Sequence, residues 1–516
     1  MEQLIYPDIP KEKFEFCRHK TERAAGELLP STGGYVKDAL RRFKQNRSSL
    51  AAFWILFGLV VFAILSPWVS GHNVRETDAT YKNHPPFLRV IADLGIGILD
   101  GAVTHESQSE TQLQIWKAIG METGMDPVIR IRGTVTRTEM RRGEEREVTY
   151  YRLENNRYYE RGIVFRTISD EEFLRIQEFQ NETGIQVIYP YVEPATIEGI
   201  RDNSNIWYRV ADKKGTPLLD DDGHLIPAYS SHTAMQGSTP YQSLRIEGDD
   251  GSYIYSYAKS GGVHVRLCYY NYYRYLHGSE PNFVFGTNLH GQCLFTAIGV
   301  GARFSLLFAL IVSAINLTVG ALFGAVQGYY GGGIDLVLDR VADILGGVPF
   351  VVVCTLFQLH LAAAVGVVPS LLFAFVLTGW LSMAALTRKQ FYRFKGREFV
   401  MASRTLGSSD RRLMFRHIFP NAVGTLITSA VLVIPGVIYS ESIMTYLGII
   451  NIQDVFGTSL GVLLSQGQTA MTAAAHAMLY PSIFISLLLI SFNLLGNGLR
   501  DAFDPSTRGV YDGYGK

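Results

Sequence analysis

The sequence is poor in charge and in cysteine for its length, and both shortages narrow the class of protein. Only 18% of its 516 residues are charged, 47 Lys and Arg against 47 Asp and Glu, whereas a soluble protein usually carries about 25%. The net charge is zero, so the chain lacks the excess of basic residues by which a nucleic-acid-binding protein is recognised. The four cysteines show no close pair and no Cys/His ligand spacing, which excludes a disulfide scaffold and a structural zinc site. The composition, 47% hydrophobic, favours a membrane protein with an added polar portion.

Motifs of enzyme chemistry are missing as well. There is no G-x-x-x-x-G-K-[ST] phosphate-binding loop, because the Gly-Lys pair of this chain is its C-terminus, Gly515-Lys516. H-E-x-x-H is also absent. The histidines between residues 71 and 300 show no metal-ligand spacing. We therefore expect a chain that is not an enzyme and that binds no metal and no cofactor of its own.

Long apolar runs predict six membrane spans. A spanning helix needs about 20 apolar residues, because a rise of about 1.5 Å per residue must cover roughly 30 Å. Leu50 to Trp68 gives the first span, and uncharged runs of that length resume only near residue 300. The remaining runs are 304–334, 344–387 (two spans, with a break at Gly366-Val-Val-Pro369), 418–440, which continues past Glu441 to about 448, and 477–499.

Basic residues in short flanking segments predict the orientation of the spans. Lys and Arg are concentrated before the first span, in 37–47, and between the fourth and fifth spans, in 388–416, whereas 449–476 has none. With both basic segments inside, we expect cytoplasmic tails at 1–48 and 500–516, a first span at 49–70 and a five-span core at 302–499. Residues 71–301 would then lie outside the plasma membrane.

The expected external segment has the pattern of a folded α+β domain. Val128 to Thr138 alternates apolar and polar residues, as a half-buried strand does, and residues 147–152 read as the returning strand after a turn at 142–144. Ser169-Asp-Glu-Glu172 is a capping-box pattern that opens a helix. The fold class is therefore an all-α six-span membrane domain with a large extracytoplasmic α+β domain inserted between spans one and two.

Two features of this segment leave alternatives open. A dense tyrosine run at 269–275 is expected to form the core and the membrane-facing rim of a small sheet, with a docking face for a partner as the alternative. Cys268 and Cys293 both fall in the external segment, so they could form a disulfide.

The cytoplasmic segment 388–420 is the most informative part of the chain. Residues 399–406 are helical in composition, Gly407 suits a helix stop, and Ser408-Ser409-Asp410 can cap a second helix on which Leu413, Met414 and His417 share a face. A helix–Gly–helix element of this kind suits insertion into a groove of a cytosolic partner. An amphipathic segment held by its arginines on lipid headgroups is an equal alternative on composition alone.

This segment resembles the E-A-A-x3-G-x9-I-x-L-P loop of ABC-importer permeases. The triplet corresponds to Met401-Ala402-Ser403, the glycine to Gly407, and the end to His417-Ile418-Phe419-Pro420. Three further stretches are similar to the C-type (OppC/DppC-like) oligopeptide and dipeptide branch: 328–335, 439–448 and 492–505. The Glu of the triplet is lost, and Glu398 lies about one turn earlier. In that family the segment before span two has the pattern G-T-D-x-x-G-R-D. Here Asn288, Gln292 and Cys293 stand in place of its first Asp, its Arg and its second Asp, which suggests that an ion pair was replaced as a unit.

The resemblance implies a type I ABC importer permease that forms half of a translocation path for peptides. The implied partners are membrane lipid, a homologous B-type permease, two cytosolic ATPases that bind ATP and Mg²⁺, and an external substrate-binding protein. The residues expected to couple the chain to the ATPases are Glu398, Ala402, Gly407, Arg411, Arg412 and Pro420.

One acidic residue, Glu441, falls inside a predicted span. Since carboxylates within a membrane are costly, we expect a polar contact in the translocation path, with a helix-packing hydrogen bond as the alternative. The rival function is a non-transporting membrane receptor whose external domain senses a ligand. Six spans with polar, Gly-rich interiors favour transport, since one anchor would suffice for sensing.

Overall fold

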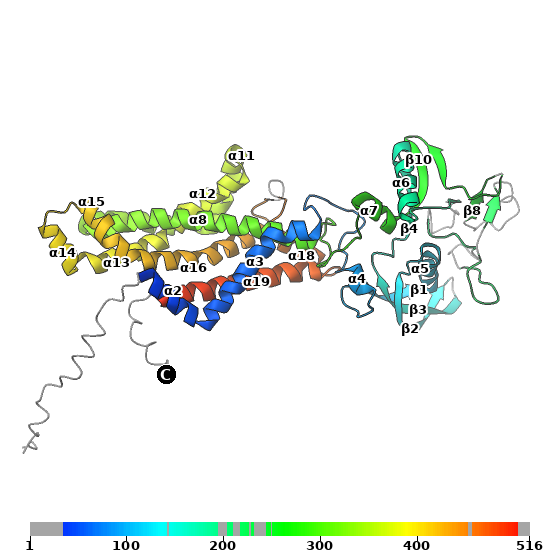
Figure 1. Cartoon of the computed structure of the whole chain (residues 1–516), viewed down its shortest axis with the longest axis horizontal. Helices are drawn as coiled ribbons and strands as arrows, with labels where there is room; N and C mark the ends of the chain where they lie inside the picture. Colours follow the sequence, from blue (N-terminus) through cyan, green and yellow to red (C-terminus); the bar gives the residue numbers. More distant parts are fainter. Residues whose placement is uncertain are drawn as a thin grey trace, which may run out of the picture.

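The computed structural model describes residues 35–141, 144–193, 204–209, 217–226, 229–231, 244–248, 250–452 and 457–503. Cys17, the turn at 142–143 and most of both predicted tails lie outside these residues. The molecule has two regions along its long axis, a helical bundle and a sheet-containing region at one end of the bundle (Figure 1).

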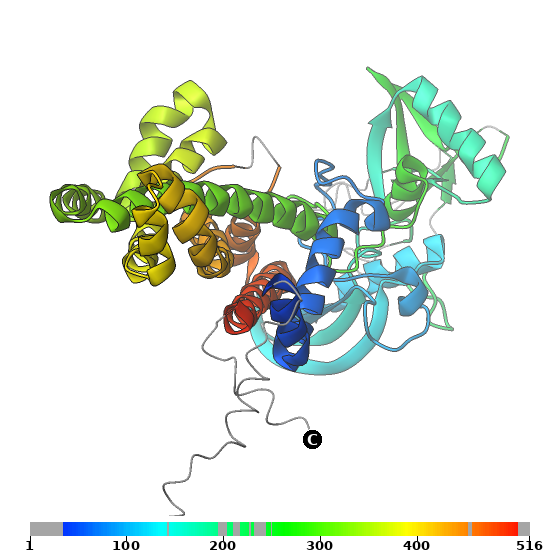
Figure 2. The same cartoon turned by 60° about the vertical axis from the view of Figure 1, so that its left-hand side comes forward.

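The bundle consists mainly of apolar helices, several of which end at a glycine. Its described helices are α2 (Tyr35–Gln45), α3 (Arg47–Ser70), α8 (Leu294–Tyr330), α9 (Gly332–Gly346), α10 (Phe350–Leu356), η3 (Phe357–Leu361), α11 (Ala362–Val365), α12 (Val367–Gly379), α13 (Leu381–Lys395), α14 (Glu398–Thr405), α15 (Asp410–Arg412), η4 (Leu413–Ile418), α16 (Phe419–Tyr446), α18 (Leu460–Ala470) and α19 (His476–Phe503). The short helix α2 lies against α19, as Figures 1 and 2 both show.

Within the described residues, five helices are long and apolar enough to cross a membrane. A sixth crossing is possible if Gly332–Gly346 and Phe350–Val365, which are bent by 72°, form one span. The break predicted at Gly366 is confirmed, because α11 ends there with a φ of +93°. The helical pair begins at Gly332, ahead of the predicted start of that span at Ile344. Its bend lies at Pro349, where the missing N–H prevents a continuous helix.

Glycines allow α8 and α13 to pack backbone to backbone. A Cβ atom at Gly324 would lie 2.2 Å from the carbonyl oxygen of Ala384, and one at Gly320 would lie 2.7 Å from that of Trp380. Small residues spaced four apart are the usual means by which membrane helices approach closely. This pair therefore forms a rigid seam that runs toward the end of the bundle occupied by α14.

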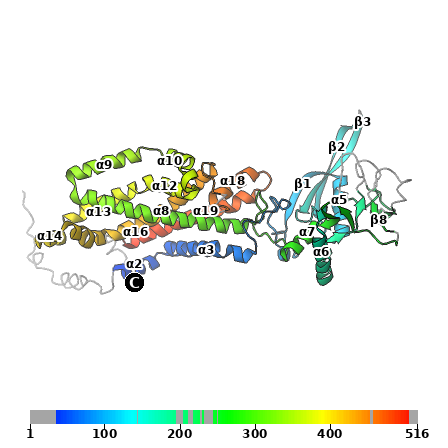
Figure 3. The same ribbon diagram turned by 90° about the horizontal axis from the view of Figure 1, so that it is seen from above.

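The sheet-containing region has three small sheets within its described residues. The first has the order β1-β3-β2, the second contains β4-β10-β5 with β9 on β10, and the third has the order β6-β8-β7. The strands are β1 (Ala102–Ser109), β2 (Val128–Arg141), β3 (Glu144–Asn156), β4 (Ile163–Ile168), β5 (Ile188–Tyr189), β6 (Val192–Glu193), β7 (Tyr229–Ser231), β8 (Leu244–Glu247), β9 (Ser256–Lys259) and β10 (Gly262–Cys268), and the helices are α4 (Arg89–Ala92), α5 (Glu110–Thr123), α6 (Asp170–Thr183) and α7 (Tyr269–His277). The β2–β3 hairpin projects from this region (Figure 3).

Several predictions for this region are confirmed. β2 and β3 pair antiparallel as the alternating pattern indicated. The half-buried face expected for β2 is not formed, because Ile129, Ile131 and Val135 are 43–49% exposed. Ser169 caps α6, its hydroxyl accepting a hydrogen bond from the Glu172 N–H at 3.1 Å. The tyrosine run forms α7, in which Tyr270, Tyr272 and Tyr273 are buried. These three side chains therefore belong to the core, as expected, and do not form a docking face.

A short polar joint connects the two regions. Asn288 Nδ2 donates to Gln292 Oε1 at 2.8 Å and to Oε1 of Gln466, a residue of α18, at 3.1 Å. Gln292 Nε2 donates to the carbonyl oxygen of Val74 at 2.6 Å. The direct Asn288–Gln292 contact agrees with the prediction that an ion pair was replaced here as a unit. α8 starts at Leu294, ahead of the domain boundary expected at 301.

Candidate functional site

The predicted coupling element lies at the end of the bundle opposite the sheets (Figures 1 and 3). α14 begins at Glu398 and ends at Thr405, and the chain turns at Gly407, where φ is +82°. Ser409 precedes α15, and its carbonyl oxygen accepts from the Leu413 N–H at 2.9 Å. The helix–Gly–helix prediction is confirmed, with the second helix continuing through η4 into α16.

One side of this element is anchored to the bundle by apolar contacts. Buried members of α14 and η4 join residues of α8 and α13 in one cluster: Ala325, Tyr329, Phe391, Val400, Leu413, Met414 and Ile418. His417 is half-buried, and its Nε2 lies 3.2 Å from Ser403 Oγ, which itself lies 2.9 Å from Ser408 Oγ. The face predicted to be shared by Leu413, Met414 and His417 is thus confirmed, and it is directed toward the bundle.

Polar contacts connect the element to the spans above it. The Tyr329 hydroxyl, near the end of α8, donates to Asp410 Oδ1 and accepts from Arg404 Nη2 at 3.2 Å. Deeper in the bundle, Arg388 donates to Asp335 and Asp339 at 2.7 Å each, which connects α13 to α9. A displacement of α14 or α15 would therefore be transmitted directly to α8, because Tyr329 contacts both.

The opposite side of the element is exposed and carries both apolar and charged side chains. All six predicted coupling residues, Glu398, Ala402, Gly407, Arg411, Arg412 and Pro420, are exposed. Aliphatic and aromatic side chains lie among them, and Leu406 is the most open at 87% exposure. Phe399, Met401 and Phe415 are exposed as well. The motif did not single out these four apolar residues, although an apolar residue beside the turn glycine is a usable signal. An apolar patch with a basic rim is typical of a protein-docking surface.

Glu441 lies inside the bundle and not at its surface. The side chain is fully buried, its Oε2 accepts from Ser305 Oγ of α8 at 2.8 Å, and its Oε1 accepts from Thr445 Oγ1 at 3.3 Å. These contacts join α16 to α8, which favours the helix-packing alternative over a contact in the translocation path.

The disulfide that the sequence allowed is not formed. Cys268 and Cys293 are free and buried, each directly before a different helix, α7 and α8, within one aromatic cluster. Burial raises the pKa of the Cys268 thiol to about 11. Both cysteines therefore serve as small core residues.

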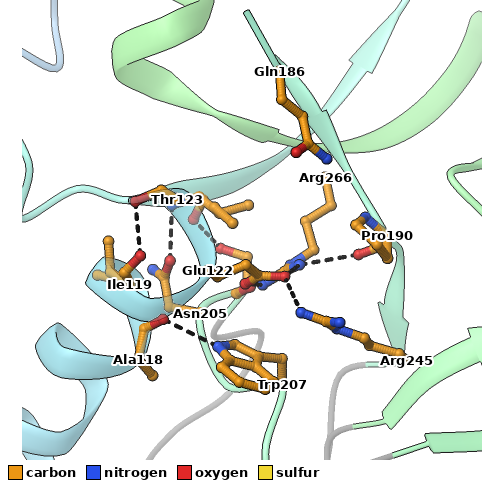
Figure 4. Close-up of polar contacts among 12 residues, drawn as sticks. Ala118, Ile119, Glu122, Thr123, Gln186, Pro190, Asn205, Trp207, Arg245 and Arg266 are labelled. Carbon is orange, nitrogen blue, oxygen red and sulfur yellow. Dashed lines mark hydrogen bonds and ion pairs between the residues drawn. The ribbon is translucent and has the colours of Figure 1, made fainter. Parts of the chain in front are cut away.

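A buried ion pair that sequence reasoning missed holds the sheet-containing region together (Figure 4). Arg266 of β10 is fully buried, and its Nη1 donates to Glu122 Oε1 of α5 at 2.6 Å and to the Pro190 carbonyl oxygen at 3.0 Å. Arg245 of β8 donates to the same carboxylate at 2.9 Å. The carboxylate of α5 thus contacts one strand of the second sheet and one of the third, and no sequence spacing could have indicated it.

Titratable groups in the described part of this region show no sign of a metal centre. Among the described residues no group of three or more His, Cys, Asp or Glu could hold a metal ion. His84 packs against the rings of Tyr81 and Tyr158, and burial lowers its pKa to about 4. It is therefore a neutral core residue near pH 7.

Comparison with known proteins matches both ends of the chain. A family model described as "Binding-protein-dependent transport system inner membrane component" matches residues 303–509, and one described as "N-terminal TM domain of oligopeptide transport permease C" matches residues 34–86. These ranges flank the sheet-containing region.

Curated relatives match at moderate identity. The oligopeptide transport system permease protein OppC of Bacillus subtilis (strain 168) is 35% identical over 43% of this chain and 72% of its own length. The dipeptide transport system permease protein DppC of the same strain is 35% identical over 43% and 69%. OppC of Escherichia coli (strain K12) is 34% identical over 44% and 74%. A solved chain of the inward-facing methionine ABC transporter MetNI is similar over 40% of this chain and 96% of its own, with 13% identity and a TM-score of 0.33.

Proposed function

Because this chain belongs to the OppC/DppC-like branch of the binding-protein-dependent transport system inner membrane components, we propose that it is a permease subunit of an ATP-driven peptide importer. It forms half of the translocation path, and a homologous B-type permease forms the other half. An external substrate-binding protein delivers the peptide. The chain itself catalyses no reaction, and ATP and Mg²⁺ are bound by the partner ATPases.

The proposed topology has six spans, with both termini in the cytoplasm and the sheet-containing region outside. Five helices are long and apolar enough to cross a membrane, and the bent pair would add a sixth crossing if it forms one span. The basic segments 37–47 and 388–416 favour a cytoplasmic location for the end that carries α14. The sheets lie at the other end of the bundle, which this orientation puts outside the cell (Figure 1).

The exposed face of α14, Gly407 and α15 carries the proposal. It combines apolar side chains, Leu406 above all, with the guanidinium groups of Arg411 and Arg412, and it is anchored from behind by a buried cluster. Such a face fits a groove on a cytosolic ATPase. Closure of the ATPases on ATP would displace this element, and the spans would move between inward-open and outward-open states.

The first experiment is gentle purification of the tagged chain from its native membrane, followed by mass spectrometry of what accompanies it. A second permease and one or two P-loop ATPases are expected. A Leu406→Asp variant should lose the ATPases and keep the second permease, because a charge enters the apolar contact. The matched control is Leu174→Asp, at an exposed position on α6 of the sheet-containing region. If the wild-type chain retains neither partner, the importer proposal fails.

A second experiment addresses Glu441. If its carboxylate only packs helices, Glu441→Gln should lower the stability of the bundle while uptake per folded complex stays unchanged. If uptake per folded complex falls with stability intact, the carboxylate acts in the translocation path instead.

A further inference from the structure

A loop between Leu88 and Leu99 exposes four aliphatic side chains. Val90, Leu94, Ile96 and Ile98 are each between 60% and 72% exposed. Folded proteins rarely leave a contiguous apolar surface uncovered unless something binds it. The coupling function does not involve this loop, because it lies at the other end of the bundle (Figure 1).

The loop has a fixed base. The Leu88 N–H donates to the Leu99 carbonyl oxygen at 2.8 Å, so the two ends of the loop are closed on each other. Phe87, just before it, is fully buried and exchanges two 2.8 Å backbone hydrogen bonds with Phe283. Loops with adjacent ends and a packed base are frequently functional. The aliphatic side chains are thus held out by an ordered backbone.

The base of the loop adjoins the end of the first span. Asn282 contacts both segments: its carbonyl oxygen lies 3.2 Å from His72 Nε2, two residues after α3 ends, and its Oδ1 accepts from the Arg89 N–H at 3.1 Å. The last turn of α3 is itself open, with Trp68 76% exposed. Figures 1 and 3 place this part of the sheet-containing region against the end of the bundle. The apolar loop therefore continues the apolar surface of α3 at the level where that helix leaves the membrane.

The charges of the loop are arranged to leave its tip neutral. No charged residue occurs from Leu94 to Leu99. Arg89 is drawn back onto the domain, where its Nη1 donates to Glu280 Oε1 at 2.7 Å and its Nε lies 3.7 Å from Asp93. Asp93 is exposed beside the tip, so no attraction to anionic lipid arises from this segment. Contact with a membrane would depend on apolar burial alone.

We propose that Val90, Leu94, Ile96 and Ile98 insert into the lipid interface beside α3 and seat the sheet-containing region on the membrane surface. The inference rests on the proposed function only in that α3 and its neighbours must cross a membrane. Side chains of this kind enter about 5–10 Å into the boundary between headgroups and acyl chains. A seated domain keeps a fixed height and tilt above the translocation path.

Spin labels on the full-length chain test this in reconstituted vesicles. The label is placed by Ile96→Cys in a Cys17→Ser background, since the other three cysteines are buried. Leu310→Cys, exposed on the apolar helix α8, reports lipid, and Leu174→Cys on α6 reports water. Accessibility to oxygen and to a water-soluble nickel complex is measured in phosphatidylcholine vesicles with and without phosphatidylglycerol.

The label at 96 is expected to be shielded from nickel and open to oxygen, at a depth between those of the two controls, in both kinds of vesicle. Equal nickel access at 96 and 174 would overturn the inference. Shielding that appears only after partner proteins are added would also overturn it, since the loop would then bind protein. A water-accessible label at 310 would instead contradict the proposed membrane spans, so the two failures are distinguishable.

A second variant keeps the test independent of one label position. Leu94→Ser, Ile96→Ser and Ile98→Ser are combined with a label at Val90→Cys. Because these side chains are exposed, the domain should fold normally, and thermal unfolding checks this. The label at 90 should be shielded in the parent loop and lose its shielding in the triple variant. Unchanged shielding would contradict insertion through the tip.

Discussion

The turn at Gly407 gives the sharpest test of the coupling element. Its φ of +82° is a conformation that residues with a Cβ adopt only at a cost, and among the described residues no atom lies within 4 Å of a Cβ built there. The penalty of Gly407→Val is therefore backbone strain alone, about 1–2 kcal/mol. Strain of that size lowers the population of the turn about 5–30-fold relative to its alternatives.

The consequence should appear in the affinity for the ATPases and in uptake. If docking needs the native turn, the apparent dissociation constant rises in proportion to the loss of the competent conformation, again about 5–30-fold. ATPase binding is measured by titrating purified ATPase onto the reconstituted permease pair, and ATP-driven uptake is measured on the same vesicles. Abundance in the membrane should not change, because the turn is exposed and outside the buried cluster.

Two matched variants isolate the backbone as the cause. Gly407→Asn should retain most binding and uptake, since Asn tolerates the left-handed region far better than Val. Gly396→Val should have little effect, because Gly396 has a φ of −93° and an equally open surrounding. The reasoning is refuted if Gly407→Val binds the ATPases like the wild type, or if Gly396→Val loses as much.

Three further outcomes are expected. Gly324→Val should lower the free energy of unfolding by about 1–3 kcal/mol, seen as earlier thermal unfolding in detergent, because its Cβ would collide with the Ala384 carbonyl oxygen at 2.2 Å. Glu122→Gln should cost about 3–5 kcal/mol in the same assay, because it leaves the buried Arg266 without its counter-charge. For His84 the pKa is near 4 when folded and about 6.5 when unfolded, so its contribution is full above pH 6.5 and falls by about 3 kcal/mol as the pH drops to 4. His84→Asn should flatten that part of the stability profile.

Each of these has a control in the same chain. Gly436→Val, also in a membrane helix but with open space around its Cβ position, should be tolerated. Glu106→Gln breaks only the exposed pair with Arg152, worth about 0–1 kcal/mol. His224→Asn replaces an exposed histidine and serves as the matched substitution. A variant that behaves like its control contradicts the contact on which the prediction rests.

Sequence reasoning succeeded where the signal was local. The spans were predicted from apolar length, the β2–β3 hairpin from alternation over much of 128–138, and the start of α6 from four consecutive residues. The predicted third span began at Ile344 because the preceding helix, α9, carries Asp335, Asp339, Arg340 and Asp343, which ended the uncharged run. Two of these charges, Asp335 and Asp339, are compensated by Arg388 of α13, a partner that the local sequence does not identify.

The sequence by itself determined the membrane class, the uncharged spans and the helix–Gly–helix element, because apolar length, residue period and glycine conformation act over a few neighbouring residues. Only the tertiary structure decided which side chains face outward and which charges meet. Glu122 and Arg266 are 144 residues apart, Glu441 meets Ser305 across two helices, and the aliphatic loop at 88–99 stands at the end of α3. Such pairings depend on how distant elements pack, and burial of apolar surface sets that packing without leaving a spacing in the chain.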